Sequence, residues 1–104
     1  MPRQRFTREM EELRTAVREL AGAVDRQLDR AAQALIRGDH SLAREVRRDD
    51  AQINHAYAEV ERRAVTLLAQ QAPAAGDLRL ILAALSAGTE LERIADTLRA
   101  WLRW

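Results

Sequence analysis

The sequence predicts an all-α fold, an up-down-up bundle of three long helices. Apolar residues recur every three or four positions along most of its 104 residues, which is the period of an amphipathic helix. Strong helix-breaking residues occur at only two places, Gly38-Asp39 and the stretch 73–77. The apolar residues are mainly Ala, Leu, Val and Ile, a composition that suits helices. Because both connections are short, neighbouring helices are expected to be antiparallel, and the length fits a single domain, residues 1–104.

The first helix is expected over residues 6–37. Thr7 can cap its N-terminus, and Gly38 can end it because glycine readily adopts the backbone conformation found just after a helix. Apolar residues at helical spacing form one stripe along it, which we expect to be the buried face. The stripe consists of Phe6, Met10, Leu13, Val17, Leu20, Val24, Leu28, Ala31 and Leu35.

The second helix is expected over residues 40–71, with Asp39 or Ser41 as its N-cap. Its apolar stripe has one gap, at Asp50. An unpaired charge at the edge of an apolar stripe is costly, so this position is expected to need a partner. The stripe consists of Leu42, Val46, Ile53, Tyr57, Val60, Ala64, Leu67 and Leu68.

The third helix is expected over residues 75–103, after Pro73 and with Asp77 as its cap. It carries apolar residues on two faces, whereas a helix in an isolated three-helix bundle needs only one buried stripe. We therefore expect two copies of the chain to associate through the second face. The alternative is that Trp101 packs onto Phe6 within one chain. The first face contains Leu78, Ile81, Leu82 and Leu85, and the predicted interface contains Leu91, Ile94, Leu98, Trp101 and Trp104.

Composition and charge argue against several classes of function. All 17 basic residues are Arg and 16 acidic residues nearly balance them, so net charge gives no general attraction to nucleic acid. No window approaches the roughly 20 apolar residues of a membrane span, and no apolar run follows the N-terminus, so we expect a cytoplasmic protein without membrane insertion. Cysteine is absent, and neither a nucleophile elbow nor a glycine-rich phosphate loop occurs, so no enzyme is expected.

The candidate chemistry lies in acidic residues. Glu92 and Asp96 are one turn apart on the third helix, on the side of its first apolar face. Carboxylate oxygens suit hard metal ions, but one helix supplies too few ligands, so the second helix would have to contribute. The alternative is that the acids are solvated or paired with Arg93 and Arg99. The predicted ligands are Glu92, Asp96, Asp50, Asp49 and Asn54, for a divalent or ferric ion such as iron, zinc, nickel or magnesium.

Two stretches resemble a known protein family. In residues 67–85 a proline-containing turn leads into a helix that starts Asp77-Leu78-Arg79. Residues 90–96, Glu-Leu-Glu-Arg-Ile-Ala-Asp, are similar to an acidic Leu-Glu-Arg-Ile-Gly-Asp motif of the same family. Weaker similarity extends through residues 6–13, 39–46 and 50–61. The chain thus resembles, over nearly its whole length, one repeat of the PhoU family of phosphate-uptake regulators.

The resemblance implies a cytoplasmic, non-enzymatic regulator that links the ATPase subunit of the phosphate ABC importer to the sensor histidine kinase of phosphate starvation. Family members also resemble metal binders with a Glu-or-Asp-x-x-x-Asp motif. Glu92 and Asp96 match that motif, whereas Asp50 and Asn54 match it with an amide in place of the second acid. PhoU proteins resemble two such repeats in tandem, and this chain has one. The alternatives are therefore a carboxylate-based metal-binding module and a structural fragment of a longer two-repeat protein.

Overall fold

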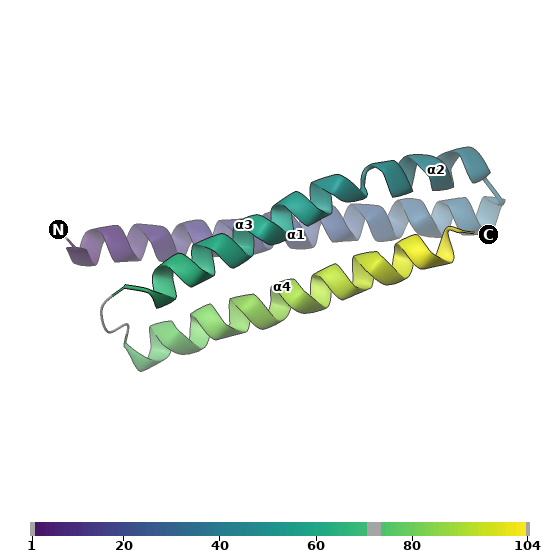
Figure 1. The fold of residues 1–104 in the computed structure, drawn as a ribbon. Coiled ribbons are helices and arrows are strands. Elements are labelled where there is room, and N and C mark those ends of the chain that lie inside the picture. Colours follow the sequence, from purple (N-terminus) through teal and green to yellow (C-terminus); the bar gives the residue numbers. More distant parts are fainter. Residues whose placement is uncertain (1, 71–73, 104) are drawn as a thin grey trace.

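The computed structural model describes residues 2–70 and 74–103, and all regular elements in these two stretches are helices (Figure 1). The prediction of an all-α protein is therefore confirmed. The predicted interface residue Trp104 and the predicted helix-terminal residue Gln71 lie outside the described residues. The elements are α1 (Pro2–Arg37), α2 (His40–Arg48), α3 (Asp50–Leu68) and α4 (Ala75–Trp101).

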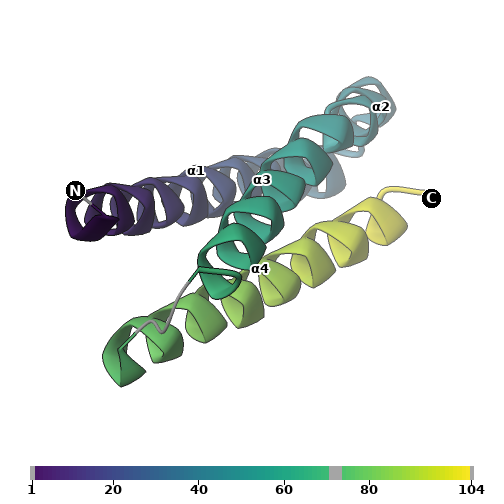
Figure 2. The same cartoon turned by 60° about the vertical axis from the view of Figure 1, so that its left-hand side comes forward.

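Four helical segments form three long rods. α1 extends along the whole molecule, α2 and α3 follow each other back along it, and α4 runs its length again (Figure 1). α1, α3 and α4 each contact the other two, and the molecule measures 54 × 19 × 16 Å. Figure 2 shows the same three rods from a second direction, with α3 crossing between α1 and α4. Within residues 2–70 and 74–103, no helix is both long and apolar enough to cross a bilayer.

The predicted helix boundary and cap at Gly38-Asp39 agree with the structure, and α4 begins at Ala75 as predicted, but two of the predicted capping residues do not cap their helices. Gly38 ends α1 with a φ of +65°, a conformation that glycine takes without strain, and the Asp39 side chain accepts a hydrogen bond from the Leu42 amide at 3.0 Å. Thr7 is not a cap, because α1 already begins at Pro2 and the Thr7 hydroxyl donates to the Arg3 carbonyl within the helix.

Asp77 is not the cap of α4 either. The N-cap is Ala74, which makes no side-chain hydrogen bond, and Asp77 lies in the first turn of the helix. A carboxylate at that position still interacts favourably with the helix dipole. The Asp77 carboxylate also lies 3.7 Å from the guanidinium of Arg3 on α1, so it connects the start of α4 to the start of α1.

The rod expected as one helix over 40–71 is divided at Asp49. The Asp49 amide donates to the Glu45 carbonyl at 3.0 Å, which closes α2, and the Asp49 carbonyl accepts from the Gln52 amide, which opens α3. The last carbonyls of a helix have no partner inside it. One of them, that of Val46, accepts a hydrogen bond at 2.9 Å from the buried Gln27 side chain of α1. A side chain of the neighbouring rod, α1, thus provides a hydrogen bond to the end of α2.

The core consists of two clusters. The larger one joins α1, α3 and α4 through most of the predicted stripes, and the smaller one joins α1, α2 and α4 at the other end. Gly88 lies where α4 packs against α3: a Cβ there would lie 3.4 Å from Val60 and 3.6 Å from Tyr57, which are ordinary contact distances. The smaller cluster contains Ala31, Ala34, Ala43, Val46, Leu98 and Leu102.

Candidate functional site

Asp49 and Asp50 are adjacent at the α2–α3 break but bind different neighbours. The Asp49 carboxylate accepts a hydrogen bond at 2.7 Å from Arg30 of α1. The same guanidinium lies 3.7 Å from the Glu45 carboxylate and donates to the Gln27 side chain at 3.2 Å. Asp49 therefore belongs to a network between α1 and α2, apart from the other predicted metal ligands.

Asp50 is buried, with 6% of its surface exposed, and it pairs with Arg99 of α4. The Arg99 guanidinium also donates to the Asp96 carboxylate at 2.8 Å, so one cation joins an acid of α3 to an acid of α4. The Asn54 amide donates to Asp50 at 3.5 Å, which turns its NH₂ group, and not its oxygen, toward the carboxylate. The structure thus brings three of the predicted ligands together around an arginine.

Glu92 belongs to the same group of charges. Partial burial raises the pKa of its carboxyl above the ordinary value, and the nearby carboxylates of Asp96 and Asp50 raise that pKa further. The Arg99 guanidinium acts in the opposite direction. We call these five residues the Arg99 cluster: Arg99, Asp50, Asp96, Glu92 and Asn54.

The Arg99 cluster does not, as arranged, fit a metal ion. In the described part of the chain, no group of three or more His, Asp or Glu side chains is placed to hold one. The Asp50 and Asp96 carboxylates are engaged by the Arg99 guanidinium, which supplies the positive charge between them. What the geometry provides is an ion-pair network that fastens the start of α3 to the C-terminal half of α4.

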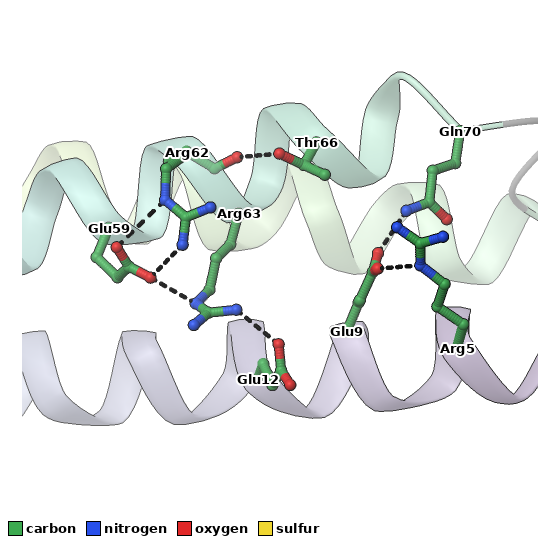
Figure 3. Close-up of polar contacts among 8 residues, drawn as sticks. All are labelled: Arg5, Glu9, Glu12, Glu59, Arg62, Arg63, Thr66 and Gln70. Atoms are coloured by element: carbon green, nitrogen blue, oxygen red, sulfur yellow. Dashed lines mark hydrogen bonds and ion pairs between the residues drawn. The ribbon is translucent and has the colours of Figure 1, made fainter.

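A second polar network connects α1 and α3 (Figure 3). The Glu59 carboxylate accepts from Arg62 at 2.6 Å and contacts Arg63 at 2.8 Å, and Arg63 reaches across to Glu12 of α1 at 2.6 Å. The hydrogen bond from Arg62 is the main reason that the pKa of Glu59 is lowered. A shallow groove of about 450 Å³ runs beside this network, but its charged walls include the paired Glu12, Glu59 and Arg63.

A separate group of polar contacts lies closer to the start of α1. The Gln70 amide donates to the Glu9 carboxylate, which also accepts from Arg5 at 3.0 Å (Figure 3). The hydrogen bond from Gln70 lowers the pKa of Glu9 more than the Arg5 charge does. The Gln70 contact connects the residues that follow α3 to α1.

The predicted apolar interface divides into exposed and buried residues. Trp101 is 56% exposed and Ile94 is 43% exposed, as an interface with another molecule requires. Leu98 is 3% exposed and lies in the smaller core cluster, so its assignment to the interface is wrong. Leu91 is partly buried against the larger cluster. Packing of Trp101 onto Phe6 does not occur, since Phe6 is near the start of α1, which contacts the start of α4 through Arg3 and Asp77, whereas Trp101 is the last residue of α4.

Two exposed leucines of α1 lie on the flank of that helix that we infer to be nearer α4. On α1, Gln27 and Arg30 face α2, and Leu28 and Leu35 lie two turns apart on the flank beyond Ala31. This flank is opposite to the side of α1 that faces α2, and we infer that it is the side toward α4.

The same reasoning applies on α4. Arg99 faces α3, so Ile94 and Trp101 occupy the flank that adjoins α1. The C-terminal halves of both rods meet in the smaller core cluster, from which we infer that the four side chains lie along one seam. We call Leu28, Leu35, Ile94 and Trp101 the α1–α4 seam.

Sequence reasoning missed the residues that secure the break. Gln27 holds the Val46 carbonyl, Arg30 holds Asp49, and Arg47 of α2 donates to the Leu102 carbonyl at the end of α4 at 2.9 Å. The available signal was Gln27 itself, a polar residue at a stripe position between Val24 and Ala31.

Comparison with known proteins identifies relatives of nearly the whole chain. The sequence model of the PhoU domain matches residues 17–104. A phosphate-specific transport system accessory protein PhoU homolog from Pseudomonas putida is 41% identical over 93 residues, which are 89% of this chain and 36% of the relative. The Pseudomonas aeruginosa homolog is 40% identical over 93 residues, and the Escherichia coli K12 protein is 35% identical over 91.

The chain spans 36% to 38% of the length of these three relatives. No solved structure matches it with comparable significance. Because the PhoU domain matches far more than half of the chain, and the match includes both the Asp50 region and the Glu92-to-Asp96 motif, the chain belongs to the PhoU family.

Proposed function

We propose that the chain is a non-enzymatic regulator of phosphate uptake and phosphate-starvation signalling that acts in the cytoplasm by binding other proteins. The observation that carries this proposal is the alignment of 89% of the chain with an accessory protein of the phosphate-specific transport system. The long rods support it, because they offer extended surfaces and their described polar networks are engaged in ion pairs. The proposed partners are the ATPase subunit of the phosphate importer and the sensor histidine kinase.

The chain acts, in this proposal, as one up-down-up repeat that associates with a second copy. Its relatives are more than twice as long, and a second bundle of the same kind would fit within the remaining length. The α1–α4 seam exposes four large apolar side chains, and apolar surface of that kind favours contact with a complementary partner. A homodimer through the seam would bury them.

Binding to purified partners tests the proposed function. The chain, carrying an affinity tag, is mixed with the importer's ATPase subunit and with the cytoplasmic part of the sensor kinase, each from the same organism. Retention of at least one of them, with a micromolar dissociation constant in interferometry, is expected. A tagged unrelated helical bundle is the control. If neither protein is retained at either high or low phosphate, the proposal fails.

A carboxylate-based metal module remains the second candidate. The observation in its favour is that Glu92 lies near the Asp96 and Asp50 carboxylates, and the position of Arg99 between Asp50 and Asp96 counts against it. The prediction of a bound divalent or ferric ion is checked by elemental analysis of protein purified without chelators. The further alternative, a structural fragment of a longer two-repeat protein, predicts no partner in the binding assay above.

A further inference from the structure

We propose that Arg99 is a built-in cation that closes the acidic cluster to metal ions and fastens the α2–α3 break to α4. The Glu-x-x-x-Asp spacing led us to expect a metal among these carboxylates, and the geometry disagrees with that expectation. The position between the acids of α3 and α4 is filled by a guanidinium from the chain itself.

Burial of Asp50 is the first reason. A carboxylate that is 6% exposed needs a compensating charge, because the cost of removing it from water otherwise exceeds what folding can supply. Arg99 provides that charge from α4, and Asn54 adds a hydrogen bond from the same helix as Asp50. Asp50 therefore already has a positive partner within the folded chain.

The second reason is that Arg99 binds two acids at once. Its guanidinium contacts Asp50 of α3 and Asp96 one turn earlier on its own helix, with the side chain only one-third exposed. A guanidinium presents several donors in a fixed plane, so it can bridge two carboxylates in this way. A metal ion from solution would have to displace a cation that is tethered to the site, which has the high effective concentration of any intramolecular ligand.

The third reason is the orientation of the remaining groups. Asn54 directs its NH₂ group toward Asp50, which presents a hydrogen-bond donor where a metal site needs an oxygen. Glu92 lies near the Asp96 and Asp50 carboxylates, which already have Arg99 as their positive partner. The stability of the chain is accordingly expected to be independent of metal ions.

Four proteins test this inference: the wild type, Arg99→Gln, Arg99→Gln with Asp50→Asn, and Arg93→Gln as the matched control. Arg93 is on the same helix, but it is exposed and pairs with Glu90 one turn away. Each protein is purified without chelators, analysed for metal content, and melted with EDTA or with added Mg²⁺, Mn²⁺, Ni²⁺ or Zn²⁺.

The wild type is expected to contain far less than one metal ion per chain and to melt at the same temperature under every condition. Arg99→Gln should lower Tm by about 5 °C or more, because Asp50 is left buried without its partner. The added Asp50→Asn should recover most of that loss, and Arg93→Gln should change Tm little. Recovery by Asp50→Asn separates loss of the pair from general misfolding.

Two results would overturn the inference. One is stoichiometric metal in the wild type that is lost in Glu92→Ala/Asp96→Ala. The other is an unchanged Tm in Arg99→Gln. If Arg99→Gln does not fold, Arg99→Lys serves instead: it keeps the charge but not the fork that bridges two acids, and it should melt between the wild type and the Arg99→Gln/Asp50→Asn protein.

Discussion

Gln27 is a buried polar side chain on the core side of α1, and its amide donates to the Val46 carbonyl at the end of α2. Replacement by Leu keeps the volume roughly constant but leaves this carbonyl without its partner. A buried polar group left unpaired costs about 1–3 kcal/mol. We expect Gln27→Leu to lower the free energy of unfolding in urea by about that amount.

Gln33→Leu is the matched control for Gln27→Leu. Gln33 is on the same helix, and its side chain donates only to the exposed Asp29 one turn away. Its loss should cost about 0.5 kcal/mol or less, as is usual for surface substitutions. Equal losses in the two variants would show that the bond to Val46 does not secure the break.

Glu92 and Glu59 have pKa values shifted in opposite directions. Burial raises the pKa of Glu92, so the folded state holds this proton more tightly than the unfolded state and stability falls as pH rises through the interval between the two values. The hydrogen bond from Arg62 lowers the pKa of Glu59, so its contribution is present above the unfolded value and is lost as pH falls through the folded value.

Replacing each of these glutamates by glutamine should therefore change the free energy of unfolding in opposite directions. At neutral pH, Glu92→Gln is expected to raise the free energy of unfolding and Glu59→Gln to lower it. Urea titrations at neutral pH and at a pH below the ordinary glutamate pKa measure both effects. The gain in Glu92→Gln should vanish in acid, where the wild-type carboxyl is protonated in both states. If Glu92→Gln still has the higher free energy of unfolding in acid, the increase comes from packing and not from charge.

Asp50 illustrates what sequence alone establishes at this scale. Its place in an apolar stripe predicts that it needs a partner, and it has one. The identity of the partner depends on how α4 is rotated against α3, which residue spacing within each helix does not determine. Arg93 and Arg99 were equivalent on that basis, whereas the structure pairs Arg93 with Glu90 and Arg99 with Asp50.

At the scale of elements, Gly88 lies where α4 packs against α3. An added Cβ would make ordinary contacts, 3.4 Å from Val60 and 3.6 Å from Tyr57. Gly88→Ala is therefore expected to stabilise the protein by about 0.5–1 kcal/mol through helix propensity. Gly88→Leu should instead destabilise it by about 1–3 kcal/mol, because the larger side chain has no room between the rods.

Thermal unfolding of the two Gly88 variants measures the difference, with Gly22→Ala as the control. A Cβ at Gly22 would approach only the flexible end of Arg26, so this substitution tests helix propensity without a helix contact. If Gly88→Leu is as stable as Gly88→Ala, α3 and α4 are not packed as closely as the structure indicates.

The elements themselves were largely predictable, and their interruptions were not. The helical spacing of apolar residues and the helix end at Gly38 indicate which parts of the sequence form the rods, and Asp39 caps α2 as expected. The division at Asp49 has no local cause, since neither Asp49 nor its neighbours are helix breakers. Its stabilising contacts come from Gln27 and Arg30 of another rod, so single-helix patterns contain no signal for it.

At the scale of the whole molecule, some residues of the predicted interface on α4 lie in the core and others lie on the surface. Apolar residues from Leu91 to Trp101 have helical spacing, but the spacing does not tell which of them face α1 or α3 in the folded chain. Leu98 falls in the core, whereas Ile94 and Trp101 remain exposed. The contribution of Leu28 and Leu35 appears only once α1 and α4 are placed side by side.

The α1–α4 seam gives the last prediction, which tests the proposed dimer. Sedimentation equilibrium at micromolar concentration should give the mass of two chains for the wild type and of one chain for Trp101→Glu or Ile94→Glu. A buried charge at the centre of an apolar contact is strongly unfavourable, whereas the same charge on an exposed side chain of the free monomer costs little. Circular dichroism should therefore remain helical in both variants.

Leu82→Glu is the matched control, because Leu82 is equally exposed on the same helix but lies on a different side of α4 from Ile94 and Trp101. It should leave the dimer intact. A monomeric wild type would remove the proposed dimer, and dissociation by Leu82→Glu with no effect of Trp101→Glu would move the interface to the other side of α4. Loss of partner binding in Trp101→Glu together with dissociation would connect the seam to the proposed regulatory function, because the partner would then recognise a surface that only the paired repeats form.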